Sequence, residues 1–144
     1  MDTNRSAPAI ATHELLIKAP AQKIWSLVAE IDHGPSWNPA VKSAKLNGSF
    51  DIGTTFNWKS GGIIIVSTLQ EIQTMTKLVW TGNAIGTRAI HVWSFQSTSD
   101  GVLVRTSESF EGWLVTLMRK SMQRTLDESL VAWLNQLKCK AESA

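Results

Sequence analysis

Leucine and methionine recur at every fourth residue along the C-terminal part of this chain. The repeat consists of Leu114, Met118, Met122, Leu126, Leu130 and Leu134. This spacing places apolar side chains on one face of an α-helix, so it predicts a single amphipathic helix from about Gly112 to Lys140. At 1.5 Å per residue, a helix of about 28 residues is roughly 42 Å long, enough to lie across a whole β-sheet.

The residues before this helix have the pattern of short β-strands separated by turns. Asn47-Gly48, Ser60-Gly61-Gly62 and Ser99-Asp100-Gly101 are typical turn sequences. The predicted strands are residues 10–17, 41–46, 54–59, 63–72, 77–81, 87–96 and 102–110. Because the last six are joined by short connections without helices, they favour an antiparallel meander. A helix from about Pro20 to Glu30 and a loop over residues 32–39, which has room for one helical turn, follow the first strand.

A bent antiparallel sheet that holds one terminal helix buries every apolar face in two layers, so the fold class predicted is α+β. With 144 residues, of which 43% are hydrophobic and 18% charged, the chain has the composition of one globular domain. We expect a single ligand-binding domain over residues 1–144, with a flexible start at residues 1–9 and a tail at residues 141–144.

Charge and cysteine content exclude several classes of function. The net charge of +2 is spread along the chain, so we expect no nucleic acid partner. One cysteine, Cys139, makes neither an internal disulfide nor a zinc cluster, and the three histidines lack metal-ligand spacing. We therefore predict no metal and no cofactor. No apolar run, Ile63–Val66 included, is long enough to cross a bilayer, and no signal sequence is visible, so a cytoplasmic protein without a transmembrane segment is expected.

Several motifs, taken in order, resemble the START-related, polyketide cyclase/dehydrase-like superfamily called SRPBCC. They are Ile17-Lys18-Ala19-Pro20 leading into Ile24-Trp25, then Trp37-Asn38-Pro39, His91-Val92-Trp93-Ser94-Phe95 and Glu108-Ser109-Phe110-Glu111-Gly112 before the last helix. The resemblance extends from about Ile10 to Leu137. It implies a helix-grip fold, in which a sheet of about seven strands and the terminal helix enclose a cavity for lipids, polyketides or other apolar molecules. Carriers, receptors, cyclases, hydrolases and co-chaperones share this scaffold, so the resemblance does not define one activity.

The hairpin around Asp100 points to a candidate site. A tight turn at Asp100-Gly101 places Trp93 opposite Glu108, whereas a turn closed by Thr98 and Gly101 places His91 opposite Glu108. In both registers one face carries His91, Trp93, Phe95, Val104, Thr106, Glu108 and Phe110, and its apolar majority predicts that it points inward. An inward acid beside an inward imidazole either anchors the polar end of a ligand or ties the sheet to the last helix, and both interpretations stay open.

Other aromatic and methionine residues are candidates for the cavity wall. The ligand-binding residues predicted are His13, Trp37, Trp58, Trp80, His91, Trp93, Thr106, Glu108, Met118 and Met122. Each tryptophan either lines a cavity or fills one, and the methionines of the last helix would form its lid. The resemblance places Trp37 beside the cavity entrance, where it gates the pocket or pins its loop to the core. His33, in the Gly-Pro loop, is expected to face solvent.

These observations favour the binding or transport of a hydrophobic or aromatic small molecule, without catalysis. One alternative is a polyketide cyclase, dehydratase or hydrolase that uses Glu108 and His91 as general acid and base. Another is a protein-interaction module like the co-chaperones of the superfamily. The sequence contains no Gly-x-Ser-x-Gly elbow, phosphate-binding loop or dinucleotide fingerprint. The expected partner is a hydrophobic small molecule, and the formation of a homodimer is left open.

Overall fold

The turn sequences between the strands produce the predicted antiparallel meander. Seven strands form one sheet in the order β1-β7-β6-β5-β4-β3-β2. The computed structural model describes residues 1–143. Its elements are β1 (Ala9–Ile17), α1 (Ala21–Ala29), the 3-10 helix η1 (Ile31–Ser36), β2 (Val41–Leu46), β3 (Thr55–Ser60), β4 (Ile63–Gln73), β5 (Lys77–Ala84), β6 (Thr87–Thr98), β7 (Gly101–Glu111), α2 (Trp113–Leu117) and α3 (Arg119–Glu142).

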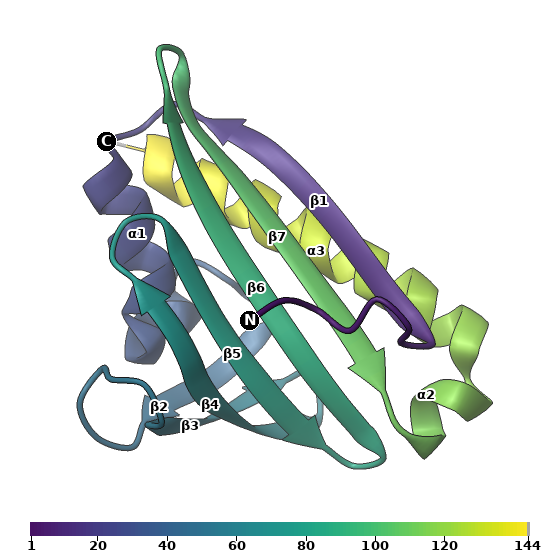
Figure 1. Cartoon of the computed structure of the whole chain (residues 1–144). Coiled ribbons are helices and arrows are strands. Elements are labelled where there is room, and N and C mark those ends of the chain that lie inside the picture. Colours follow the sequence, from purple (N-terminus) through teal and green to yellow (C-terminus); the bar gives the residue numbers. More distant parts are fainter. Residues whose placement is uncertain (144) are drawn as a thin grey trace.

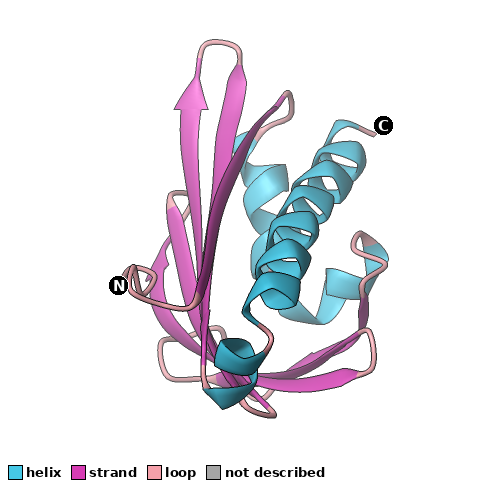
Figure 2. Cartoon of the chain, turned by 90° about the vertical axis from the view of Figure 1, so that its right-hand side faces the viewer, coloured by secondary structure: helices cyan, strands magenta, loops and turns pink. Residues whose placement is uncertain are grey.

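The sheet is strongly curved, and the helices lie on its concave side. Figure 1 shows the long strands β6 and β7 running beside α3, and Figure 2 shows the sheet bending around the same helix. This is the α+β helix-grip arrangement that the sequence and the resemblance predicted. Side chains alternate along each strand, so one face of the sheet packs toward the helices while the other faces outward.

Helix α3 packs its apolar stripe into two groups of buried residues. Leu134 and Leu137 pack with Trp25 and Ile17, and Leu126 packs with Val115, Ala9 and other small residues of β1. These leucines are at most 3% exposed. The stripe predicted from the four-residue repeat is therefore the packed face of the helix over this part of the chain.

Gln123 attaches α3 to the edge strand β1. The Ile10 N–H donates to Gln123 Oε1 at 3.0 Å, and Gln123 Nε2 donates to the Ile10 carbonyl oxygen at 2.9 Å. The side-chain amide pairs with the backbone of this edge strand as a neighbouring strand would. The Gln123 amide thus supplies hydrogen-bond partners to an edge that the sheet leaves unpaired.

The prediction of one helix from Gly112 to Lys140 is wrong in its first third. Met118, with φ −114° and ψ 40°, separates the short helix α2 from α3. The separation lets α2 turn so that Val115 is fully buried while Leu117 is 75% exposed. Because the four-residue apolar repeat continues through the break, the pattern alone does not reveal it.

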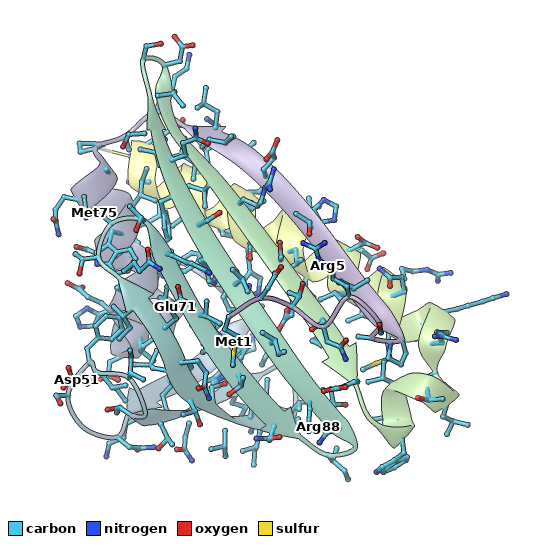
Figure 3. The ribbon with its side chains drawn as sticks, viewed as in Figure 1. Met1, Arg5, Asp51, Glu71, Met75 and Arg88 are labelled. Atoms are coloured by element: carbon cyan, nitrogen blue, oxygen red, sulfur yellow. The ribbon has the colours of Figure 1, made fainter. Side chains whose placement is uncertain are left out.

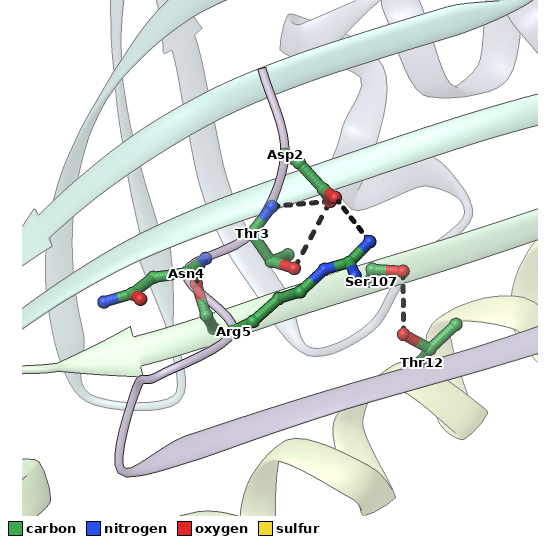
Figure 4. A network of polar contacts seen from close by, with 7 residues as sticks. Asp2, Thr3, Asn4, Arg5, Thr12 and Ser107 are labelled. Atoms are coloured by element: carbon green, nitrogen blue, oxygen red, sulfur yellow. Dashed lines mark hydrogen bonds and ion pairs between the residues drawn. The ribbon is translucent and has the colours of Figure 1, made fainter.

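The N-terminal residues cross the outer, convex face of the sheet. The Asn4 N–H donates to Ser109 Oγ at 3.0 Å, and Asn4 Nδ2 donates to Glu111 Oε2 at 3.0 Å. Figure 4 shows this segment over β6 and β7, near the hydrogen bond between Thr12 and Ser107. Flexibility of residues 1–9 stays a prediction. At the other end, α3 continues through Glu142, and Ala144 lies outside the described residues.

Candidate functional site

The β6–β7 hairpin selects one of the two predicted registers. Thr98 pairs with Gly101, so His91 lies opposite Glu108 and Trp93 lies opposite Thr106. His91, Trp93 and Thr106 are at most 1% exposed. The prediction that this face points inward is confirmed.

Aromatic side chains fill one half of the space between the sheet and α3. Trp93 is fully buried and stacks on Phe95 and on His91, with ring centroids 6.4 and 5.2 Å apart. Trp25 meets Phe95 edge to face at 5.5 Å, and Trp133 of α3 lies 5.8 Å from Trp93. This half is therefore solid core.

The other half, toward α2, holds a cavity of about 220 Å³. A single water molecule needs only about 10–15 Å³ measured in the same way, so the cavity has room for an organic molecule. Its lining side chains come from β3 to β7, from the β5–β6 turn and from both C-terminal helices. They are Trp58, Ser60, Ile63, Ile65, Ser67, Trp80, Gly82, Ala84, Ile85, Thr87, Ala89, Glu108, Phe110, Leu114, Met122, Thr125, Ser129 and Trp133.

Small residues create this space. Gly82, Ala84 and Ala89 occupy inward positions of β5 and β6, and all three line the cavity. In the filled half, the equivalent inward positions of these strands carry Leu78 and Trp93. The side chains that would reach α3 are therefore missing at one end of the same two strands, and helix and sheet do not meet there.

Glu108 is the ionisable residue among the side chains that line the cavity. Its side chain is 12% exposed, and it comes from the middle of the inward face of β7. Burial away from water disfavours the carboxylate and raises the pKa of Glu108 to about 8. At neutral pH this group is a protonated carboxylic acid, which both donates and accepts hydrogen bonds.

His91 lies directly behind Glu108 and does not reach the cavity wall. Its Nδ1 is 3.6 Å from Glu108 Oε2, and its Nε2 forms a hydrogen bond of 2.7 Å with Thr106 Oγ1. Among the described residues, Nδ1 has no hydrogen-bond partner. Burial lowers the pKa of His91 to about 3, so the imidazole beside the protonated carboxyl group is uncharged at neutral pH. The pair thus contributes polarity to the cavity without a formal charge.

The structure brings four of the ten predicted site residues to the cavity wall: Trp58, Trp80, Glu108 and Met122. His91 and Thr106 form the layer behind Glu108, and Trp93 belongs to the filled half. Trp58 Nε1 donates to Ser67 Oγ at 2.9 Å, which fixes the indole in the wall.

The other three predicted residues lie elsewhere. His13 Nε2 is 2.8 Å from Asp127 Oδ1, so it joins β1 to α3. Trp37 is 6% exposed, and its Nε1 donates to the Leu27 carbonyl oxygen at 2.8 Å, which attaches its loop to α1. This contact agrees with the interpretation that Trp37 pins its loop to the core. Met118 is 45% exposed because the break between α2 and α3 turns it away from the cavity. His33 is exposed, as expected.

Sequence reasoning missed the small residues and Trp133. Gly82 and Ala84 share the strand face of Trp80, so their alternation already indicated an inward surface without large side chains. Trp133 lies between the filled half and the cavity, with its ring centroid 5.8 Å from that of Trp58. Only the curvature of the sheet determines that position.

Within residues 1–143, no group of three or more histidine, cysteine or acidic side chains is arranged to hold a metal ion. None of the helices in this range combines the length and the apolar character needed to span a bilayer.

A curved antiparallel sheet closed by one long helix is the helix-grip fold, the fold of START-like proteins. The chain belongs to the family described as polyketide cyclase / dehydrase and lipid transport, whose model matches residues 8–142. No curated protein matches the sequence. The resemblance inferred from the motifs is therefore confirmed at the level of the family.

Three solved structures illustrate the shared fold. A hypothetical protein of Helicobacter pylori superposes with a TM-score of 0.86 at 18% identity, over 96% of this chain and 90% of that one. The di-domain ARO/CYC StfQ of the steffimycin biosynthetic pathway gives a TM-score of 0.79 at 16% identity, over 93% of this chain and 50% of that one. A START superfamily protein of Mycobacterium smegmatis gives a TM-score of 0.71 at 14% identity, over 89% of this chain and 96% of that one. At these identities the likeness extends to the fold alone.

Proposed function

We propose that this protein binds a small, uncharged and largely apolar molecule in the cavity between β3–β7 and the two C-terminal helices. The observation that carries the proposal is the cavity of about 220 Å³ with Glu108 on an otherwise uncharged wall. Apolar burial would supply most of the affinity, at roughly 25 cal/mol per Å², and a few polar groups would set the orientation.

Hydrogen-bond donors on the wall favour a ligand with an acceptor group such as a carbonyl. Protonated Glu108 donates one hydrogen bond. Ser67 Oγ already accepts from Trp58, so its own hydroxyl hydrogen is free to donate toward the cavity. The lining contains no lysine, arginine or histidine. A carboxylate ligand would therefore be buried without a counter-charge, and we expect neutral ligands to bind more tightly than their acids.

Binding of prodan, an uncharged naphthalene ketone, tests the proposal. We expect saturable quenching of tryptophan fluorescence, because Trp58, Trp80 and Trp133 line the cavity. Ala89→Phe places a ring into the cavity and should weaken binding by about tenfold or more, a loss of about 1.4 kcal/mol. The matched control is Ala132→Phe on the exposed side of α3, which should bind prodan like the wild type. The cavity is not a ligand site if the wild type, Ala89→Phe and Ala132→Phe all bind prodan equally, or if none of the three binds it.

A second candidate function is catalysis on an enolisable carbonyl compound, which the contact of Glu108 with His91 favours. Glu108 would donate its proton to the carbonyl oxygen while its second carboxyl oxygen accepts the α-proton, so the acid is regenerated as the enol forms, and His91, which does not reach the wall, would pack behind the carboxyl. Under this alternative, Glu108→Gln abolishes product formation while prodan binding persists. Native mass spectrometry of freshly purified protein identifies the retained molecule on which either function is assayed.

A further inference from the structure

Exposed apolar side chains gather where the cavity opens. Ile85 in the β5–β6 turn is 75% exposed, and Ile63 at the start of β4 is 53% exposed. On α2 and the residue after it, Trp113, Leu117 and Met118 are 65%, 75% and 45% exposed. We call these five residues the mouth rim. Large apolar side chains this exposed normally mark a surface that meets something apolar.

The β5–β6 and α2 parts of the rim form one continuous surface. The Leu114 N–H donates to the Gly86 carbonyl oxygen at 3.1 Å, which fastens α2 to the β5–β6 turn. A Cβ atom on Gly86 would lie 2.8 Å from the Trp113 ring, so turn and helix are in close contact. Ile63, Ile85 and Leu114 also line the cavity. The exposed rim and the cavity wall are therefore parts of the same apolar surface.

Positive charges border the rim. Arg119, Lys120 and Arg124 follow Met118 on exposed positions of α3, and Arg88 at the start of β6 is 68% exposed. Two acids lie near them: Glu111 is 3.9 Å from Arg88, and exposed Glu128 lies one turn after Arg124 on α3. Figure 3 places Arg88 at the end of the sheet near α2, far from Asp51 in the β2–β3 loop. Tryptophan and aliphatic tips flanked by arginine and lysine are the composition of surfaces that lie in a membrane interface.

We infer that the mouth rim docks this protein onto the surface of an anionic lipid bilayer, with the cavity opening toward the lipid. The rim consists of a turn and a short helix with protruding side chains, which insert into a soft headgroup layer. A second copy of the chain is disfavoured because a two-fold contact would bring the same arginines and lysine together. Docking would let an apolar ligand pass between bilayer and cavity without crossing water.

Co-sedimentation with lipid vesicles tests the docking. We expect the protein to bind phosphatidylcholine vesicles that contain about 30% phosphatidylglycerol and to bind pure phosphatidylcholine far less, since each basic residue near an anionic surface contributes about fivefold in partitioning. Added salt should weaken the binding. Arg119→Gln should reduce it by about fivefold. Trp113→Ala combined with Leu117→Ala should reduce it by about tenfold or more. Ile52→Ala, 64% exposed in the β2–β3 loop, is the matched control and should bind like the wild type.

Tryptophan quenching by brominated acyl chains locates the contact. Trp113 is 65% exposed, so bromines should quench it in the wild type and have little effect in Trp113→Phe. The inference is overturned if the protein does not bind the vesicles, or if neither Arg119→Gln nor the Trp113→Ala and Leu117→Ala double variant weakens the binding. Loss of a dimer in the double variant, measured by analytical ultracentrifugation, would also overturn it and make the rim a contact between copies. Ala89→Phe should still bind vesicles, so the outcome is separable from that of the ligand proposal.

Discussion

Glu108→Gln isolates the effect of burying an acid in the cavity wall. The pKa of Glu108 is about 8 in the folded protein, against 4.5 for an ordinary glutamate. Between these values the unfolded chain has lost the proton and the folded protein keeps it, so stability falls as pH rises. The stabilising contribution of the proton is fully present below pH 4.5 and is lost as pH rises through about 8.

The magnitude follows from the same shift. One pKa unit corresponds to about 1.4 kcal/mol, so the full span of about 3.5 units amounts to about 5 kcal/mol of unfolding free energy. This is a large part of the roughly 5–15 kcal/mol by which a domain is stable. The lowered pKa of His91 acts in the opposite direction, because its contribution is present above pH 6.5 and is lost as pH falls toward 3. Since His91 is present in both proteins, the difference between variant and wild type cancels its contribution.

Urea unfolding followed by tryptophan fluorescence measures this difference. Relative to wild type, Glu108→Gln should gain about 1.4 kcal/mol per pH unit between about pH 5 and about pH 8, or about 4 kcal/mol in all. Glu128→Gln, an exposed position on α3, is the control and should keep a constant difference from wild type. If the stability curves of Glu108→Gln and wild type run parallel over this range, the acid is not protonated in the fold and the argument for a donor in the cavity fails.

Two further substitutions test how the helices are held, both by the same unfolding assay. Gln123→Ala removes both hydrogen bonds between α3 and the backbone of Ile10 and should cost about 2 kcal/mol, whereas an unchanged midpoint would show that the edge of β1 needs no partner. Gly112→Ala should cost about 3 kcal/mol or more, because Gly112 has φ 123° and its new Cβ would overlap the Gly86 carbonyl oxygen. Gly62→Ala, where the methyl group meets nothing within 4 Å, should have little effect; equal losses at both glycines would contradict the overlap.

The sequence predicted the elements because their signals are local. Turn residues such as Asn47-Gly48 end strands wherever they occur, and the four-residue repeat indicates a helix without reference to the sheet. The common inward face of His91 and Glu108 also followed from strand periodicity alone. Local patterns did not show the break at Met118, because the apolar repeat runs through it and only the docking of α2 on the β5–β6 turn requires it.

The sequence by itself thus determined the α+β class, the order of the elements and the presence of an acid and an imidazole on the inner face. The tertiary structure decided which inner residues meet a void. Trp93 fills one end of the concave face and Trp58 borders the cavity at the other, although both are inward tryptophans on strands. The difference arises because α3 touches the curved sheet closely only where large side chains oppose it. Helix α3 separates from the sheet beside Gly82 and Ala89, and the distance between helix and sheet there depends on side chains from several strands.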